Sequence, residues 1–124
     1  MTEACDLSAV EARRLIGARK LAPTELLDSC LKRIEATNGA VNAIVAMDAG
    51  AARAQAKAVE AKLARGEDAG LLAGLPLGIK DLQATAGLRS TQGSLLFKDH
   101  VPAEDEFGVA NLRAAGGIIL AKTN

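Results

Sequence analysis

The stretch LPLGIKDLQATAG, residues 75–87, decides the fold. Its first half alternates between apolar and other residues, with Leu75, Leu77 and Ile79 separated by Pro76, Gly78 and Lys80. Because side chains alternate between the two faces of a strand, the period of two predicts a short strand with Gly78 and Lys80 on one face. Glycine leaves space beside the lysine stem, so the strand ends on an ammonium group with room around it.

Three helices are predicted before this strand. Ser8 and Glu11 have the spacing of a capping box, in which each side chain bonds to the other's backbone N–H. Pro23 suits the first turn of a second helix, which we expect to end at Asn38-Gly39. Its apolar stripe consists of Leu27, Cys30, Leu31 and Ile34. The alanine-rich segment 48–65 predicts the third helix, and a short strand is expected at 41–47, where Ile44 and Val45 occur.

After the central strand, residues 87–93 are rich in Gly, Ser and Thr and predict an irregular segment. Asp105 is the expected cap of a helix with Phe107, Ala110 and Ala114 on one side, and Gly116-Gly117 ends it. The run at 118–120 predicts a final strand. The order of elements is that of an α/β fold, with a helical portion at about 7–66 and a strand-bearing portion at about 74–124. Two or three strands are few for such a sheet, so we expect an incomplete domain.

Composition excludes several classes of function. The chain has 124 residues, with 15 Lys plus Arg against 15 Asp plus Glu, so no net charge attracts nucleic acid. Two cysteines and one histidine are too few for a structural zinc site, and neither a metal nor a cofactor is expected. The acidic N-terminus does not resemble an export signal, and no run of 18 apolar residues occurs. We therefore expect a cytoplasmic protein without a membrane segment.

Lys80 is the residue most suited to a chemical role. Burial among the flanking apolar residues would lower its pKa from about 10.4, and a neutral amine can accept the proton of a hydroxyl group. The alternative is structural: Lys80 marks the point where the strand reaches solvent and forms a weak pair with Asp81. Spacing alone favours this alternative, because lysines are mostly exposed.

Several short segments of the sequence, taken together, resemble those of the amidase signature family. They are GLPLGIKDL at 74–82, AGL at 86–88, STQGS at 90–94 and RAAGGIILAKTN at 113–124. The segment from Gly78 to Leu82 is the most specific part. The resemblance covers essentially the whole chain and implies the N-terminal part of a single amidase domain, with its first helices and first strands of a mixed-sheet α/β/α fold.

The resemblance also implies a reaction, in which a Ser, cis-Ser, Lys triad hydrolyses a carboxamide or transfers its ammonia. Lys80 falls on the triad lysine, whereas the Gly/Ser-rich signature that carries the serines is absent from residues 1–124. We therefore expect residues 1–124 alone to be inactive, because triad members act as a unit. The implied substrate is a small amide, and the implied partner is a second copy or a partner chain of the amidotransferase type. We expect residues outside residues 1–124 to select the amide.

Three other features of the sequence allow a functional interpretation. Ser94 is a candidate substrate-binding residue, because the family places this word near its active centre, although a Gly-Ser turn is equally expected in any loop. The pattern from Gly116 to Thr123 is within one residue of a phosphate-binding loop, but its middle residues form the predicted strand, so nucleotide binding is not expected. Finally, the amphipathic helices allow a non-catalytic helical interaction module derived from an amidase.

Overall fold

The computed structural model describes residues 2–124 and confirms the predicted α/β fold. The helices are α1 (Ala9–Gly17), α2 (Pro23–Val41), α3 (Ala49–Ala64) and α4 (Phe107–Ala114), with short 3-10 turns η1 (Ala4–Asp6) and η2 (Leu95–Phe97). The strands are β1 (Ile44–Met47), β2 (Pro76–Lys80) and β3 (Ile118–Thr123). Their order along the chain is the predicted one, so the change from helical to strand periodicity was a sound guide.

The three strands form one mixed sheet in the order β1-β3-β2. The central strand, β3, is antiparallel to β1 and parallel to β2. A strand with neighbours on both sides and layers above and below has no face for solvent, which explains the apolar run at 118–121. The β2–β3 ladder is irregular between Leu77 and Gly78 and then pairs Ile79 with Lys122 and Lys80 with Thr123.

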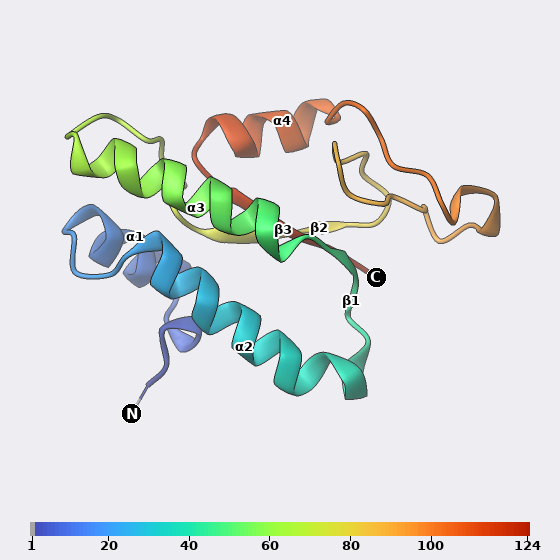
Figure 1. Ribbon diagram of the computed structural model, residues 1–124, viewed down its shortest axis with the longest axis horizontal. Coiled ribbons are helices and arrows are strands. Elements are labelled where there is room, and N and C mark those ends of the chain that lie inside the picture. Colours follow the sequence, from blue (N-terminus) through green and yellow to red (C-terminus); the bar gives the residue numbers. More distant parts are fainter. Residues whose placement is uncertain (1) are drawn as a thin grey trace.

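Helices cover both faces of the sheet (Figure 1). On one face, Leu27 of α2 and the small side chains Ala52 and Ala56 of α3 pack on Ile118 and Leu120 of β3. Alanines allow α3 to approach the strand closely, which suits a core with almost no aromatic residues. On the other face, Val109 of α4 packs with Leu88 on Ile79 and Ile119. A further cluster ties α1 to α2 and the start of β2; it consists of Ala12, Ile16, Leu21, Leu26 and Leu75.

The predicted apolar stripe of α2 is confirmed, and the predicted capping box of α1 is confirmed in part. Ser8 caps α1 by accepting from the Glu11 N–H at 3.2 Å, but only this half of the expected capping box forms among the described residues. The stripe of α2 is confirmed, with Leu27 fully buried and Cys30, Leu31 and Ile34 packed at the edge of the core.

The predicted end of α2 at Asn38-Gly39 is wrong. The helix continues to Val41, and Asn42 ends it in the left-handed conformation at φ 53°. Asn38 instead bonds to the strand that follows. Its side-chain amide donates to the Ile44 carbonyl and accepts from the Ile44 N–H, at 3.0 and 2.9 Å. These two bonds fix the turn from α2 into β1.

The predicted cap of α4 is also displaced by one residue. Glu106 occupies the N-cap position, while the Asp105 carboxylate accepts from the Ala86 N–H and from Arg113. Phe107, Ala110 and Ala114 share a side as predicted, and that side is exposed to solvent. The buried side of α4 carries Val109 instead.

A close backbone approach joins the end of α4 to the loop before β2. Gly116 has a φ of +89°, and a Cβ built on it would lie 2.0 Å from the Ala69 carbonyl oxygen. The Gly116 carbonyl accepts from the Gly74 N–H at 3.0 Å, and that of Ala115 accepts from the Leu72 N–H at 2.8 Å. Gly116 therefore ends the helix and admits the neighbouring loop.

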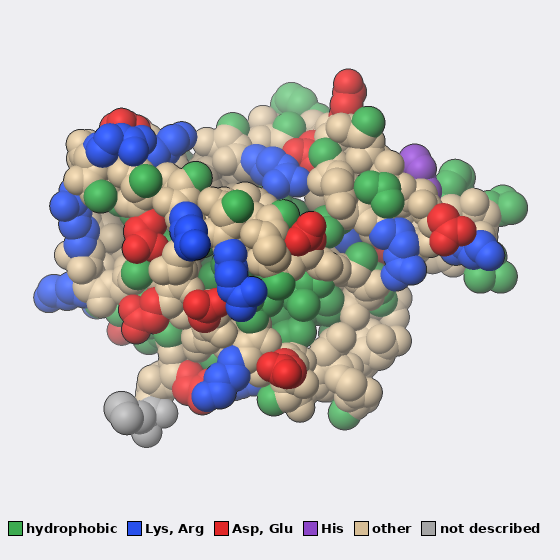
Figure 2. Space-filling model, viewed as in Figure 1, with side chains coloured by type: hydrophobic (Ala, Val, Ile, Leu, Met, Phe, Trp, Pro, Cys, Tyr) green, Lys and Arg blue, Asp and Glu red, His purple; other side chains and the backbone are tan. Residues whose placement is uncertain are grey.

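The long connection between β2 and α4 projects from one end of the molecule (Figure 1). At its tip Leu95 and Leu96 are 87% and 90% exposed, and apolar side chains gather at this end in Figure 2. Within residues 2–124, none of the helices combines the length and apolar character that a membrane crossing requires.

Candidate functional site

Lys80 is the last residue of β2, and its side chain is exposed. A Cβ built on Gly78 would lie 2.9 Å from the Thr123 Cγ2 atom, so Gly78 and Thr123 share one face of the sheet. Lys80, two residues after Gly78 and paired with Thr123, belongs to the same face. The predicted relation between Gly78 and Lys80 is therefore confirmed.

The expected burial of Lys80 is wrong for the part of the chain that the structure describes. The flanking apolar residues face the other way, and Ile79 alone is buried at this end of β2. The weak pair with Asp81 is not found among residues 2–124 either, because the Asp81 carboxylate serves the loop that follows.

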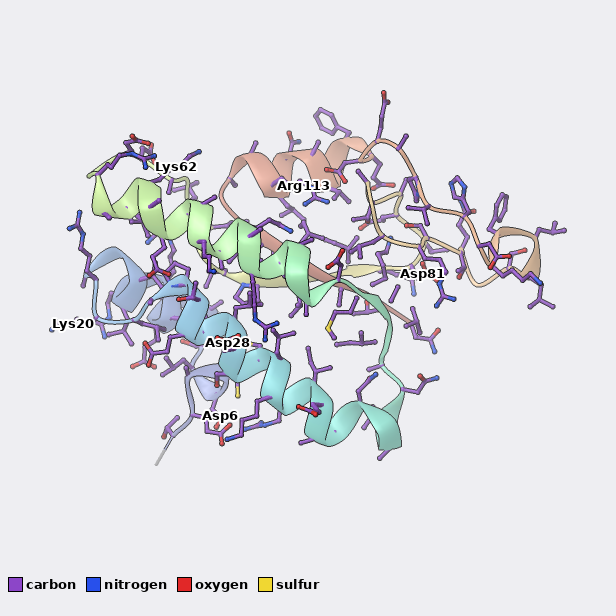
Figure 3. All side chains as sticks on the ribbon, viewed as in Figure 1. Asp6, Lys20, Asp28, Lys62, Asp81 and Arg113 are labelled. Atoms are coloured by element: carbon purple, nitrogen blue, oxygen red, sulfur yellow. The ribbon has the colours of Figure 1, made fainter. Side chains whose placement is uncertain are left out.

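Asp81 folds this loop back over the end of β2. Its carboxylate accepts from the Thr91 N–H at 2.9 Å and from the Thr91 hydroxyl, and its carbonyl accepts from the Gln92 N–H at 2.8 Å. Only 9% of Asp81 is exposed. Figure 3 shows Asp81 at the base of the projecting connection, where it leaves the sheet. A buried carboxylate that accepts several hydrogen bonds holds the two ends of the loop together.

The loop closes a shallow depression around Lys80. The cavity has a volume of about 160 Å³ and is lined by Lys80, Asp81, Leu82, Gln92, Gly93 and Asn124. Every lining residue comes from the end of β2, the end of β3 or the turn that Asp81 fixes. Lys80 thus lines a small hollow at the carboxyl end of two parallel strands, a common place for ligand sites in α/β sheets.

Ser94 does not line this hollow, although its neighbour Gly93 does. The Ser94 hydroxyl accepts from the Leu96 N–H at 3.2 Å and caps the short turn η2. The structure therefore gives Ser94 a local role in the loop and does not bring it to Lys80.

A second lysine, absent from the predicted site, lies on the other face of the sheet. Lys122 is fully buried, and its ammonium donates to the Gln83 carbonyl, to Thr85 Oγ1 at 2.9 Å and to Ser90 Oγ at 3.0 Å. Burial lowers the pKa of Lys122, and the carboxylates of Asp81, Glu106 and Asp105 oppose that shift. In the sequence it occurs in the segment RAAGGIILAKTN and in the phosphate-loop pattern, and neither gave it a role of its own.

Arg113 of α4 (Figure 3) and Asp105, which lies just before that helix, support the same region. Arg113 donates to the Asp105 carboxylate at 2.6 Å and to the Ala86 carbonyl at 3.3 Å. Burial pulls the pKa of Asp105 upward, but the hydrogen bonds from Arg113 and from the Ala86 N–H outweigh it and hold the pKa below its usual value. The pair connects α4 to the loop that surrounds Lys122.

Two other features offer little chemistry. The cavity of about 200 Å³ between α1, α2 and α3 contains Arg19 and Glu60, but Arg19 donates to the Leu63 carbonyl and Glu60 accepts from Thr24. In the described residues, the single group with three metal-type ligands is Glu3, Cys5 and Asp6. Its two carboxylates are paired with Arg33, at 3.3 and 3.0 Å.

Comparison with protein families gives a match to the Amidase model over residues 25–124. Among similar sequences is a glutamyl-tRNA(Gln) amidotransferase subunit of Roseiflexus castenholzii, 42% identical over 124 residues, all of this chain and 25% of that protein. The chain thus spans about a quarter of the length of the relatives that it matches.

Solved structures give the same result. A bacterial aryl acylamidase of the amidase signature family superimposes with a TM-score of 0.87 and 30% identity, over 95% of this chain and 25% of that one. The peptide amidase of Stenotrophomonas maltophilia superimposes with a TM-score of 0.89 and 28% identity, over 96% of this chain and 25% of that one.

Proposed function

Because the chain belongs to the amidase signature family, we propose that it is the N-terminal part of an amidase or amidotransferase domain in which Lys80 is the catalytic base. The observation that carries the proposal is the position of Lys80. It ends β2 in the segment LGIKD and lines a hollow together with Gln92 and Asn124.

In the proposed reaction Lys80 acts in its neutral form. The amine accepts a proton through the hydroxyl of the cis-serine, the activated serine attacks the amide carbon, and ammonia or an amine leaves. Backbone N–H groups hold the oxyanion, and water then releases the acid. We expect both serines to lie in a part of the domain outside residues 1–124. Because triad members act as a unit, residues 1–124 alone are expected to be inactive.

The exposure of Lys80 indicates a second role for the part of the domain outside residues 1–124. We therefore assign to the rest of the domain the role of covering the hollow around Lys80. The relatives, about four times as long as this chain, have the length that such a cover needs.

The proposed substrate is a small amide, and the proposed partner is a second copy of the chain or an amidotransferase-type subunit. A hollow of about 160 Å³ is smaller than most ligand pockets, so residues outside residues 1–124 are expected to complete the site and select the amide. The relatives named as amidotransferase subunits favour glutamine as an ammonia donor and a partner chain of the amidotransferase type. A homodimer is the simpler assembly. Two free cysteines fit a reducing, cytoplasmic location.

A panel of amides tests this function in the protein made from the complete reading frame that contains residues 1–124. Ammonia release is measured from glutamine, an aliphatic amide and an aryl amide, each with and without an acceptor. Turnover of any of them supports an amidase, and release from glutamine that depends on the acceptor supports an amidotransferase. A folded protein that turns over none of them favours the interaction module that the amphipathic helices allow.

A further inference from the structure

The loop 81–92, which borders the hollow around Lys80, is wrapped around a buried ammonium group. Lys122 reaches it from β3, and all three of its hydrogen-bond partners belong to the loop: Gln83, Thr85 and Ser90. An ammonium has three donors, so the three acceptors satisfy it completely. The described residues contain no buried side-chain nitrogen or oxygen without a partner.

The partners of Lys122 offer an acceptor to each of the three donors of a charged side chain. The Thr85 hydroxyl donates to the Gln83 carbonyl at 3.0 Å, and the Ser90 hydroxyl donates to the Leu88 carbonyl at 3.0 Å. Each hydroxyl has one proton, which is thus already used, and can only accept from Lys122. A neutral amine has two donors and would leave one of the three acceptors without its bond. The carboxylates of Asp81, Glu106 and Asp105 offset part of the cost of burying this charge.

A serine beside a lysine also invites a catalytic interpretation, which the geometry excludes. Ser90 is 3% exposed, and its hydroxyl proton is directed at the Leu88 carbonyl. A nucleophile needs access to substrate and a base that can take its proton, whereas here the lysine is the donor. The Lys122–Ser90 hydrogen bond therefore has a structural role and not a catalytic one.

The loop is connected to the site of Lys80 at both ends. Its first turn begins on β2, where the Gln83 N–H donates to the Lys80 carbonyl at 3.0 Å and the Asp81 N–H to the Thr123 carbonyl at 2.8 Å. Its last residues, Thr91 and Gln92, are held by Asp81. A change at the centre of the loop is thus transmitted to Gln92, which lines the hollow.

We propose that Lys122 is a positioning residue for the Lys80 site: its ammonium acts as the internal anchor of loop 81–92 and thereby fixes the rim of the hollow. As a statement about the active centre this rests on the proposed function of Lys80. The anchoring itself is a property of the chain alone and can be measured without any amide substrate.

The test compares two side chains that differ in one group. Lys122→Cys is prepared with Cys5→Ser and Cys30→Ala, unfolded, and alkylated with 2-bromoethylamine or with 1-bromopropane before refolding. The first reagent restores an ammonium at the length of lysine, and the second places a methyl group there. The unalkylated control carries Cys5→Ser and Cys30→Ala with Lys122 intact. Hydrogen exchange of the backbone N–H groups of Thr91 and Gln92 is then compared with that of Ala52 and Ala56 in α3.

We expect the propyl form to lose protection at Thr91 and Gln92 by about tenfold or more, with α3 unchanged, because the buried acceptors of the loop lose their charged donor. The aminoethyl form should return to within about threefold of the control. Equal protection of the loop in both forms, or no recovery with the ammonium, overturns the proposal, as does an equal loss in α3.

If the propyl form does not refold, Ser90→Ala decides, because it deletes one acceptor and leaves the charge. Loss of protection confined to residues 81–92 supports the anchor, and unchanged protection overturns it. None of these outcomes depends on amide turnover. Failure of Lys80 as a base would appear as unaltered turnover in a Lys80 variant, so the two proposals fail in different experiments.

Discussion

Lys80 and Lys122 lie one position apart in the β2–β3 register and occupy opposite faces of the sheet. Lys80 pairs with Thr123, and Lys122 pairs with Ile79. Lys80 is exposed at the edge of a hollow, whereas Lys122 is fully buried with all its donors satisfied. One lysine is thus exposed, and the other bonds to the loop beside it.

Gly78 keeps the face of Lys80 open, which predicts a cost for Gly78→Ala. The added methyl would lie 2.9 Å from Thr123 Cγ2, so we expect a loss of about 1–2 kcal/mol in the free energy of unfolding. Urea denaturation measures it. Thr123→Ser removes the contacting methyl, and in that background Gly78→Ala should cost much less. An equal cost in both backgrounds would show that the contact is not the cause.

Gly116 predicts a larger effect. In Gly116→Ala the new Cβ would overlap the Ala69 carbonyl oxygen at 2.0 Å, and that oxygen belongs to the backbone of a fixed turn. We expect a loss of about 3 kcal/mol or more. Gly87→Ala is the matched control, since its φ is +78° and no heavy atom lies within 4 Å of the Cβ position. It should cost about 1 kcal/mol, which is the effect of the left-handed conformation alone. Similar losses for the two variants would refute the close approach.

Asp105 predicts a dependence of stability on pH. Its folded pKa lies below the unfolded value, because the bonds from Arg113 and Ala86 outweigh burial. The carboxylate therefore stabilises the fold above the unfolded pKa of about 3.9, and this contribution is lost as the pH falls through the folded pKa. Asp105→Asn should lower the free energy of unfolding by about 2 kcal/mol at pH 7, and by less as the pH falls below 4.

Urea denaturation of both proteins between pH 7 and pH 3 measures this difference. Asp28→Asn is the control, because the Asp28–Arg53 pair is exposed and is expected to contribute less than about 0.5 kcal/mol at any pH. A difference between wild type and Asp105→Asn that stays constant over this range would contradict the assignment.

The strands and helices could be predicted because their apolar residues recur with regular periods. The short sequence segments around Lys80 indicated the family. The ends of two helices could not be predicted. Asn38 and Asp105 have the right chemistry for caps, but each makes its bonds to another segment, to Ile44 and to Ala86. Local sequence does not show such competition between local and tertiary partners.

Lys122 was missed for a similar reason. It directly follows the apolar run 118–121 of β3, which indicates that it belongs to a strand buried on both faces. Its acceptors lie 32 to 39 residues earlier in a loop without periodicity. The burial of Lys80 was expected from its apolar neighbours, yet alternation turns those neighbours to the opposite face.

The most direct test of the account compares Lys80→Ala with Lys98→Ala in the protein made from the complete reading frame. Lys98 is an exposed lysine of the projecting connection and serves as the matched control. With the best amide of the panel, we predict that Lys80→Ala lowers kcat/KM by about a thousandfold or more, while Lys98→Ala stays within about threefold of wild type. A Lys80→Ala protein that is folded and retains wild-type kcat/KM would contradict the central claim.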